Sequence, residues 1–278
     1  MATADVEIAA VVLAAGEGRR LRPLTEHLPK ALCPVGNVAL LDLALRRLAG
    51  LGFTGRGRLA VNASYLGDQV VAAVGDRAHV SVEEQPLGTS GALGRLRRWL
   101  DGRGALVCNS DAYLAGGDLA PLLAGWDGRG TRILGVPAEP GQRAEFTGSD
   151  GGYRFAGLSL LPWSRVAGLG DEPSDLVRTV WRPAEAAGEL TVLDYAGTYL
   201  DTGTPHDYLA ANLHTTRGGT LLHPDAVVTG EAHHAVVGAG AVVRGRIERT
   251  VVWPGAVVEG DESLVDAIRY PGGTVAAG

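Results

Sequence analysis

The stretch Ile8-Ala-Ala-Val-Val-Leu-Ala-Ala-Gly-Glu-Gly-Arg-Arg-Leu-Arg-Pro-Leu-Thr25 decides the fold of this chain. Its first six residues, Ile8–Leu13, form a continuous apolar run, which predicts a buried strand of a parallel sheet. Gly16 and Gly18 follow, and glycine permits positive φ and a close approach of the backbone to a bound anion. Because three of the next four residues are arginines, we interpret the stretch as a strand that runs into a loop suited to a polyphosphate.

Short apolar runs alternate with amphipathic segments over the first two hundred residues. We expect further strands at residues 58–62, 80–84 and 105–108, and helices at residues 38–51, 68–74 and 91–100. This alternation is typical of a parallel sheet covered by helices on both faces. Ligands of such sheets bind beyond the carboxyl ends of the strands, where residues 16–25 and 109–111 are expected.

The last sixty residues carry an internal repeat. His223-Pro-Asp-Ala-Val-Val228 recurs as Gly238-Ala-Gly-Ala-Val-Val243, as Trp253-Pro-Gly-Ala-Val-Val258 and, more loosely, as Tyr270-Pro-Gly-Gly-Thr-Val275, at offsets of 15, 15 and 17 residues. Glycine or proline corners followed by β-branched residues at a regular period indicate a β-solenoid with one repeat per coil. The spacing resembles a short left-handed β-helix, and we expect it to occupy residues 218–278, after a first domain of residues 1–217.

Composition limits the classes of protein to which the chain can belong. The net charge of −6 and the pI of about 5.6 argue against a nucleic-acid partner. Cys33 and Cys108 lie in apolar stretches, as expected for buried free thiols of a reducing compartment. The first seven residues lack a basic signal-peptide region, and the apolar run from residue 8 to residue 15 is too short to cross a bilayer. We therefore expect a cytoplasmic protein with no membrane partner.

The chain contains one lysine, Lys30, in His27-Leu-Pro-Lys-Ala31, whereas its other fixed cations are arginines. Arginine replaces lysine easily on a solvated surface, but it does not replace a compact ammonium beside a phosphate. The lone lysine therefore indicates a site whose chemistry resists the exchange. The glycines of the first loop fit neither Gly-x-x-x-x-Gly-Lys-Ser/Thr nor Gly-x-Gly-x-x-Gly, which argues against a Walker loop and a dinucleotide fingerprint.

The combined motifs resemble those of the sugar-1-phosphate nucleotidylyltransferases. The family signature Leu-Ala-x-Gly-x-Gly-Thr-Arg-Leu-x-Pro-Leu-Thr is similar to the stretch that ends at Thr25. Four further segments resemble family motifs: Pro29-Lys-Ala-Leu-Cys-Pro-Val35, Pro86-Leu-Gly-Thr-Ser-Gly-Ala-Leu93, Leu106-Val-Cys-Asn-Ser-Asp111 and Tyr199-Leu-Asp-Thr-Gly-Thr-Pro205. The resemblance implies an α/β fold, namely a Rossmann-like nucleotidyltransferase domain with a mainly parallel sheet, followed by the left-handed β-helix. Among such enzymes, those similar to mannose-1-phosphate guanylyltransferase fit best.

The resemblance also implies roles for individual residues. The catalytic residues would be Arg20 and Lys30, and the Mg²⁺ ligands would be Asp111 and Asp201, since hard oxygen donors with open water positions suit Mg²⁺. The nucleotide would be bound by Leu13, Ala14, Ala15, Gly16, Gly18, Glu83, Gly88 and Thr89. The sugar would be bound by Asn109, Glu145 and Gly157. In the implied reaction a sugar-1-phosphate oxygen attacks the α-phosphorus of a nucleoside triphosphate and pyrophosphate leaves.

The sequence departs from the family pattern at several positions. Arg19 stands where the family has threonine, and Ser110 stands where it has glycine. Many relatives bind the sugar phosphate with a second lysine, which this chain lacks. We expect an arginine to replace it, and the candidates are Arg143, Arg154 and Arg178.

Glu83 is our first candidate for the residue that reads the base. Pyrimidine-using relatives carry glutamine there, whereas a carboxylate only accepts hydrogen bonds and so suits the two neighbouring donors of guanine. This favours GTP over UTP and dTTP. If the register is shifted, Glu84 or Gln85 would take that role.

Other hypotheses stay open at this point. The chain could be a non-catalytic relative that binds the nucleotide sugar as a regulatory subunit. It could also be a hexapeptide-repeat acyltransferase, for which His233-His234 are the candidate bases. An exposed end coil of a short solenoid favours a homo-oligomer.

Overall fold

The computed structural model describes residues 6–148 and 151–278, which fold into two compact units. Each unit combines two separate segments of the chain. The first contains residues 6–17 and 43–199, and the second contains residues 18–42 and 200–278. The predicted boundary between residues 217 and 218 divides the chain into segments that would fold independently, which is a different division from these two units. That boundary stays a prediction.

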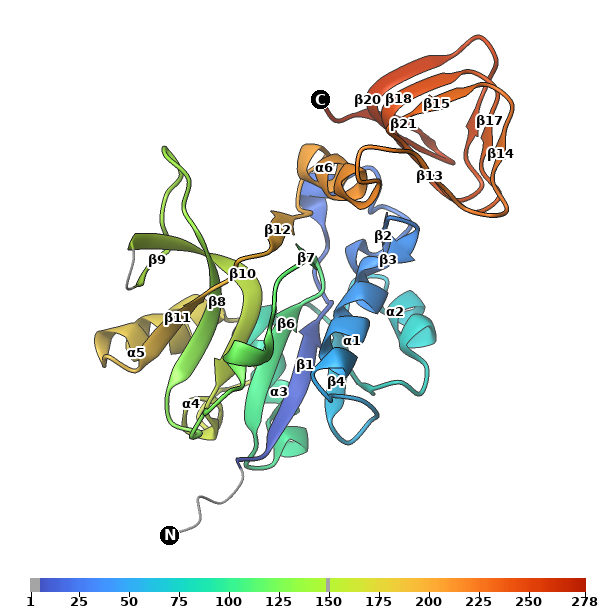
Figure 1. Ribbon diagram of the computed structural model, residues 1–278. Helices are drawn as coiled ribbons and strands as arrows, with labels where there is room; N and C mark the ends of the chain where they lie inside the picture. Colours follow the sequence, from blue (N-terminus) through green and yellow to red (C-terminus); the bar gives the residue numbers. More distant parts are fainter. Residues whose placement is uncertain (1–5, 149–150) are drawn as a thin grey trace. The chain divides into compact units, whose positions relative to one another are not determined.

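A mainly parallel, Rossmann-like sheet forms the centre of the first unit (Figure 1). Its strands run in the order β11-β8-β10-β6-β1-β4-β5, with β9 added beside β10. β1, β4, β5 and β6 are mutually parallel, and only β10 runs antiparallel to its neighbours β6 and β8 in the main order. The strands are β1 (Ile8–Leu13), β4 (Leu59–Ala63), β5 (His79–Val82), β6 (Gly104–Asn109), β8 (Thr131–Pro137), β9 (Phe146–Gly148), β10 (Gly151–Leu161) and β11 (Leu190–Asp194). The predicted α/β sheet is thus confirmed, and β1 has the predicted bounds.

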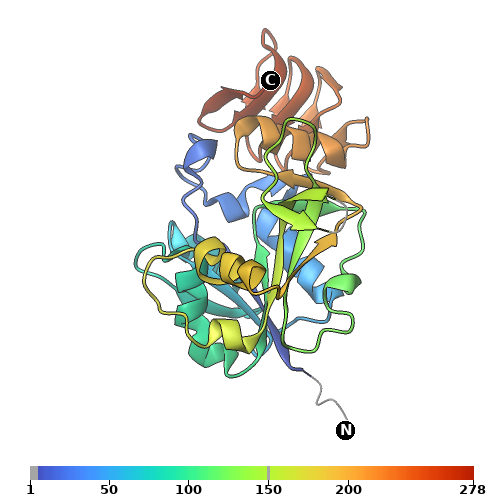
Figure 2. The same cartoon turned by 90° about the vertical axis from the view of Figure 1, so that its left-hand side faces the viewer.

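Helices cover this sheet and supply its core. Apolar side chains of α3, α4 and η4 pack on one face with Val11, Val107 and Ile133, and Figure 2 shows α3 and α4 on the same side of the strands. On the opposite face, Arg47 of α1 reaches the Cys108 Sγ atom and donates to the Ala112 carbonyl oxygen at 3.0 Å.

The helices named above and their neighbours have the following bounds: α1 (Leu40–Gly50), α2 (Gly67–Val74), α3 (Gly88–Leu100), α4 (Trp163–Val166), η4 (Val177–Trp181) and α5 (Arg182–Ala186). The short elements outside this sheet and its helices are β7 (Ala112–Ala115), β12 (Thr198–Asp201), η1 (Arg19–Leu21), η2 (Lys30–Leu32) and η3 (Ala120–Leu122).

The helix expected at residues 38–51 begins two residues later than predicted. Residues 38 and 39 form β3 (Val38–Ala39), which pairs antiparallel with β2 (Pro34–Val35). Gly36 and Asn37 connect the two strands with φ of 58° and 64°. A two-residue turn with both φ values positive is the favoured hairpin connection, so Gly-Asn between two valines was the signal that the helical prediction missed.

One face of α3 lies against the backbone of residues 170–174. A Cβ atom on Gly88, Gly91 or Gly94 would lie 2.3, 2.4 or 1.7 Å from a backbone carbonyl oxygen of that segment. The three glycines are spaced by three residues, so they share one side of the helix. This absence of side chains lets the backbone of the segment approach the helix directly.

Gly94→Ala is expected to lower the melting temperature, because the new methyl group would overlap the Gly170 carbonyl oxygen. Overpacking costs about 1–3 kcal/mol or more, which exceeds the helix propensity gained from alanine. Gly168→Ala is the matched control, since a Cβ atom there would meet nothing within 4 Å. Equal melting temperatures for both variants in a thermal scan would contradict this packing.

The second unit contains the repeat segment, in which short parallel strands stack in register. Val227, Val242 and Val257 align across β14, β17 and β19, and Leu221, Val236, Val251 and Ile268 align across β13, β16, β18 and β20. These pairs reproduce the offsets of 15, 15 and 17 residues, so the repeats do form stacked coils, while the left-handed winding stays a prediction. The bounds are β13 (Leu221–Leu222), β14 (Val227–Val228), β15 (Glu231–His233), β16 (Val236–Val237), β17 (Val242–Val243), β18 (Arg246–Val252), β19 (Val257–Val258), β20 (Ser263–Tyr270) and β21 (Gly273–Ala276).

The fourth repeat does not form a coil. β21 folds back and pairs antiparallel with β20, with Tyr270 opposite Gly273. Pro271 and Gly272 thus make a hairpin turn rather than a solenoid corner, and the prediction of a fourth stacked register is wrong. The hairpin covers the last coil, which would otherwise expose unpaired backbone groups along its edge.

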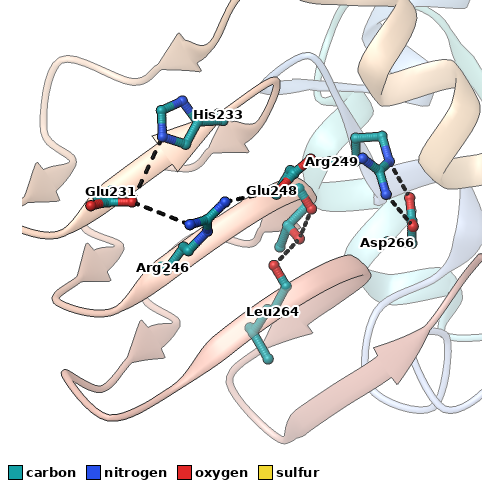
Figure 3. A network of polar contacts seen from close by, with 8 residues as sticks. Glu231, His233, Arg246, Glu248, Arg249, Leu264 and Asp266 are labelled. Atoms are coloured by element: carbon teal, nitrogen blue, oxygen red, sulfur yellow. Dashed lines mark hydrogen bonds and ion pairs between the residues drawn. The ribbon is translucent and has the colours of Figure 1, made fainter.

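Charged side chains connect neighbouring coils on one side of the repeat segment (Figure 3). Arg246 lies 3.8 Å from Glu231 of the preceding coil and 3.3 Å from Glu248. Arg249 donates two hydrogen bonds, of 2.6 and 2.7 Å, to the carboxylate of Asp266 in the next coil. His233, one of the two candidate bases, lies 3.9 Å from Glu231 in the same group of charged side chains.

No helix among the described residues combines the length and the apolar character needed to span a membrane.

Candidate functional site

Three parallel strands of the first unit end at the same level. Leu13 at the end of β1 aligns with Asn62 of β4 and with Asn109 of β6. The backbone N–H of Ser110 donates to the Leu13 carbonyl oxygen at 3.0 Å, which extends the pairing beyond the strands. The predicted nucleotide-binding residues after Leu13, and the predicted residues Asn109 and Asp111, therefore follow strands that end together at the carboxyl edge of the sheet.

A buried chain of hydrogen bonds joins the loops at this edge. The Ala14 backbone N–H donates to Asn62 Oδ1 at 2.7 Å, and Asn62 Nδ2 donates to Glu83 Oε1 at 2.8 Å. Glu83 Oε2 accepts from the backbone N–H of Leu87, the residue before α3, at 3.0 Å. The chain of hydrogen bonds links the segment after β1, the end of β4 and the segment after β5 to the start of α3. The sequence prediction did not include Asn62, although an amide at the end of an otherwise apolar strand was the available signal.

Glu83 is engaged inside the unit rather than open to solvent. The residue is 3% exposed, and each carboxylate oxygen already accepts one hydrogen bond. Burial raises the pKa of Glu83 above its usual value, while the Leu87 and Asn62 donors offset part of that rise. Glu84 and Gln85 are exposed. Which of the three reads the base stays a prediction.

The raised pKa of Glu83 has a consequence for stability. Since the folded state holds this proton more tightly than the unfolded chain, the contribution of Glu83 is present below the ordinary pKa of 4.5 and is lost as pH rises through the folded-state pKa. Glu83→Gln stays neutral throughout. The unfolding free energy of the wild type should therefore fall relative to that of Glu83→Gln as pH increases through this window.

Urea unfolding at several pH values from 4 to 7 measures this difference. An exposed neighbour without a titrating group provides the control: for Gln85→Ala, the difference in unfolding free energy from the wild type should be independent of pH. A difference between wild type and Glu83→Gln that is independent of pH would contradict the burial argument.

The two glycines of the first loop behave differently. Gly16 does not use the positive φ that glycine permits, and a Cβ atom there would meet nothing within 4 Å. Gly18 does adopt it, with φ of 62°. A Cβ atom on Gly18 would lie 2.9 Å from the Thr25 side chain and 3.1 Å from Lys30 Cβ. Thr25 also donates to the Gly18 carbonyl oxygen at 2.9 Å, which closes the loop.

A cavity of about 550 Å³ lies in the first unit beside β6, β10 and η4. Three of the predicted nucleotide-binding and sugar-binding residues line it, namely Thr89, Asn109 and Glu145. The Thr89 hydroxyl accepts from the Leu176 backbone N–H at 2.9 Å, and Glu145 Oε2 accepts from the Phe155 N–H at 2.7 Å. The other wall residues are Val107, Arg143, Ala144, Phe146, Phe155, Ser159, Asp175, Leu176, Val177, Trp181 and Arg182.

Two other predicted residues of the first unit, Gly157 and Gly88, do not line this cavity. Gly157 has φ of 82° within an irregular part of β10, and a Cβ atom there would lie 2.3 Å from the Ala112 side chain. Gly88 has φ of 71° at the start of α3. Among the three arginines considered for the missing lysine, Arg143 lines the cavity, whereas Arg154 bonds Gln142 and Arg178 pairs with Asp175. Arg182 lines the cavity as well and was not predicted.

The second unit brings together Arg20, Lys30 and Asp201. Arg20 Nη2 lies 3.5 Å from Asp201 Oδ2, and Lys30 Nζ lies 3.8 Å from Asp201 Oδ1. Lys30 is only 8% exposed, whereas the Arg20 side chain is 67% exposed. A Cβ atom on Gly203 would lie 2.5 Å from Arg20 Nη2, so this glycine makes room for the guanidinium. The two predicted catalytic cations therefore share one predicted metal ligand.

The donor atoms present are compatible with Mg²⁺. No group of three or more His, Cys, Asp or Glu side chains within residues 6–148 and 151–278 is arranged to hold a metal ion. Asp201 is a carboxylate, a hard oxygen donor, and its nearest printed cation contacts are 3.5 Å to Arg20 and 3.8 Å to Lys30. Mg²⁺ commonly uses one or two carboxylates together with water and substrate phosphates. Since Asp111 and Asp201 belong to different units, their sharing of one ion stays a prediction.

A family model described as the MobA-like NTP transferase domain matches residues 10–217. The chain belongs to this family. The resemblance to sugar-1-phosphate nucleotidylyltransferases is thus confirmed at the level of the family, and the match includes every predicted site residue.

Relatives support the same assignment. The chain is 37% identical over 129 residues to a mannose-1-phosphate guanylyltransferase of Mycobacterium tuberculosis, a match that covers 44% of this chain and 34% of the relative. It is 36% identical over 109 residues to an N-acetylmuramate α-1-phosphate uridylyltransferase of Neisseria meningitidis, covering 37% and 46%. A mannose-1-phosphate guanyltransferase of Aspergillus fumigatus is 29% identical over 253 residues, covering 78% and 68%. The first two matches thus span a third to a half of the relatives' length.

Solved structures support the fold. A putative glucose-1-phosphate thymidylyltransferase from Bacillus anthracis superposes with a TM-score of 0.60 at 19% identity, covering 74% of this chain and 94% of the other. HddC from Yersinia pseudotuberculosis superposes with a TM-score of 0.61 at 19% identity, covering 74% and 99%. At this identity the likeness concerns the fold alone.

Proposed function

We propose that this chain transfers a nucleotidyl group from a nucleoside triphosphate to a sugar-1-phosphate. The observation that carries the proposal is the position of Lys30, the one lysine of the chain, which is buried beside Asp201 and within the same cluster as Arg20. A buried ammonium and a neighbouring guanidinium, both within the family match, suit the charge that develops on a phosphate under attack.

In the proposed reaction, an oxygen of the sugar phosphate attacks the α-phosphorus. The bond from that phosphorus to the bridging oxygen of the β-phosphate breaks, and pyrophosphate leaves with its electron pair. Arg20 and Lys30 stabilise the negative charge on the phosphate and on the departing pyrophosphate. The backbone at residues 13–18 holds the nucleotide phosphates. Catalysis then rests on positioning and electrostatic stabilisation, without a covalent enzyme intermediate.

The metal proposal concerns Asp111 and Asp201. When bound, Mg²⁺ would offset the charge of the phosphates and orient them. Arg20 and Lys30 lie beside Asp201, so their charges offset the charge of that carboxylate.

GTP and mannose-1-phosphate are the substrates that we propose first. The guanylyltransferases named above favour both substrates, and a carboxylate at Glu83, or at the exposed Glu84 next to it, favours GTP. The uridylyltransferase relative makes UTP, with an amino-sugar phosphate, the second candidate. Asn109, Glu145 and Gly157 would contact the sugar, with Arg143 or Arg182 in place of the missing second lysine.

For the repeat segment we propose a left-handed β-helix, with the transferase domain ending near residue 217. We also propose a homo-oligomer; since β21 covers the last coil, the edge that remains for assembly is the first coil, at β13 and β14. We place the reaction in the cytoplasm, where nucleoside triphosphates are available.

Pyrophosphate release tests the proposal directly. GTP, UTP, dTTP, CTP and ATP are each combined with a panel of sugar-1-phosphates and Mg²⁺, and release is expected with GTP above the others and to stop when EDTA is added. Preference for UTP or dTTP would contradict the guanine assignment but not the class of enzyme. Binding of free nucleotide without release from any pair would favour a regulatory relative.

Lys30→Arg is expected to reduce the rate by roughly 10²–10³, as when one charge-stabilising donor is lost from an active site. The positive charge is kept, but the planar guanidinium does not fit the buried position of the ammonium. Arg129→Lys, on a side chain that is 90% exposed, is the matched control and should keep full activity. A folded Lys30→Arg protein with wild-type turnover would contradict the role of Lys30.

A further inference from the structure

Two side chains in the wall of the cavity carry polar atoms without a hydrogen-bond partner. Across the described residues, the buried side-chain polar atoms that lack a partner are Thr131 Oγ1, Ser159 Oγ, Trp181 Nε1 and Arg269 Nε. Ser159 is fully buried and Trp181 is 7% exposed. Both belong to the cavity wall, whereas Thr131 and Arg269 do not.

A buried polar atom without a hydrogen-bond partner destabilises the folded protein, and an apolar residue of similar shape would avoid this destabilisation. Ser159 aligns with Val107 on one side and with Ile133 on the other, both apolar, so the sheet itself does not require a hydroxyl group there. A ligand that enters the cavity and supplies the missing partners would account for both residues.

The surroundings define the chemistry of that ligand. The Trp181 ring lies 4.5 Å from the Phe155 ring and 5.8 Å from the Phe146 ring, measured between centroids. The guanidinium of Arg182 lies over Phe146 at 4.9 Å. Aromatic faces suit the C–H face of a sugar ring, while an indole N–H needs an acceptor and a serine hydroxyl can donate or accept. A polyhydroxylated ring offers both kinds of surface.

The position of the cavity favours the sugar over the base. The cavity wall uses β6 and β10, which lie on one side of β1 in the sheet order. The Asn62–Glu83 hydrogen bond, with the exposed Glu84 and Gln85, lies at β4 and β5 on the other side of β1. The two parts of the substrate pair would thus bind on opposite sides of the loop that follows β1.

We propose that Ser159 and Trp181 determine sugar specificity by hydrogen bonding to ring hydroxyl groups in this cavity. The inference rests on the proposed nucleotidyl transfer, for which it identifies two residues of the sugar site. Trp181 Nε1 donates to a hydroxyl oxygen, and the Ser159 hydroxyl bonds a second hydroxyl group.

Ser159→Ala removes one of the two polar atoms and keeps the packing nearly unchanged. Trp181→Phe removes the other together with part of the indole ring, so its effect on the KM for the sugar phosphate is compared with its effect on the KM for the nucleotide. Each variant is expected to raise the KM for the sugar phosphate by roughly 3- to 10-fold, the value of one hydrogen bond, while the KM for the nucleotide stays the same. Ser159→Ala should also melt at the wild-type temperature or higher, since an unsatisfied group is removed from the ligand-free protein. A merely structural role for Ser159 would instead lower the melting temperature.

Thr131→Val is the matched control, because it removes a buried unpartnered hydroxyl that lies outside the cavity. It should leave the KM for the sugar phosphate unchanged. Equal effects of Thr131→Val and Ser159→Ala, a shift in the KM for the nucleotide instead, or wild-type constants in both cavity variants would overturn the inference.

Calorimetric titration with the panel of sugar-1-phosphates separates this inference from the proposed function. Wild-type binding that weakens in both cavity variants, without pyrophosphate release from any pair, would support the site while contradicting nucleotidyl transfer. Pyrophosphate release by the wild type together with unchanged sugar-phosphate affinity in both variants would support the function and overturn the site. An absence of binding to every sugar phosphate of the panel would overturn the site as well.

Discussion

The hydrogen bond from the Ala14 backbone to the Asn62 side chain is the interaction on which the first unit's functional edge depends. It fixes the first residue after β1, at the point where the glycine-rich loop leaves the sheet. The Asn62 side chain is itself held in place because its Nδ2 atom donates to Glu83, and Glu83 in turn accepts from the Leu87 backbone N–H. Because all of these groups are buried, breaking one bond leaves another polar group unsatisfied. The segments after β1 and β5, the end of β4 and the start of α3 are therefore coupled.

Close backbone approach is the second constraint. The glycines of α3 let residues 170–174 lie directly against the helix, and this segment leads into Asp175, Leu176 and η4, which form part of the cavity wall. In the second unit, Gly18 and Gly203 make similar room around Thr25, Lys30 and Arg20. The absence of a Cβ atom at these glycines thus leaves the space that the neighbouring charged and polar side chains occupy.

Much of this arrangement could be predicted from the sequence, because it depends on local patterns. The apolar run Ile8–Leu13 gave a strand with the correct bounds, and the repeat offsets gave the register of the stacked coils. Predictions failed where tertiary context decides between alternatives. Pro271-Gly272 could form a solenoid corner or a hairpin, and only the pairing of β21 with β20 distinguishes them. Asn62, Ser159 and Trp181 carry no motif, since their significance lies in partners that are distant in sequence or missing.

Amide hydrogen exchange at Ala14 tests the central claim most directly. The Ala14 N–H donates to a side chain rather than to a neighbouring strand, so its protection should depend on Asn62. The account predicts slow exchange in the wild type and much faster exchange in Asn62→Ala at Ala14 and the following residues, while the amides inside β1 remain protected. Equal protection of the Ala14 amide in both proteins would show that the loop is held by something other than the Asn62–Glu83 chain.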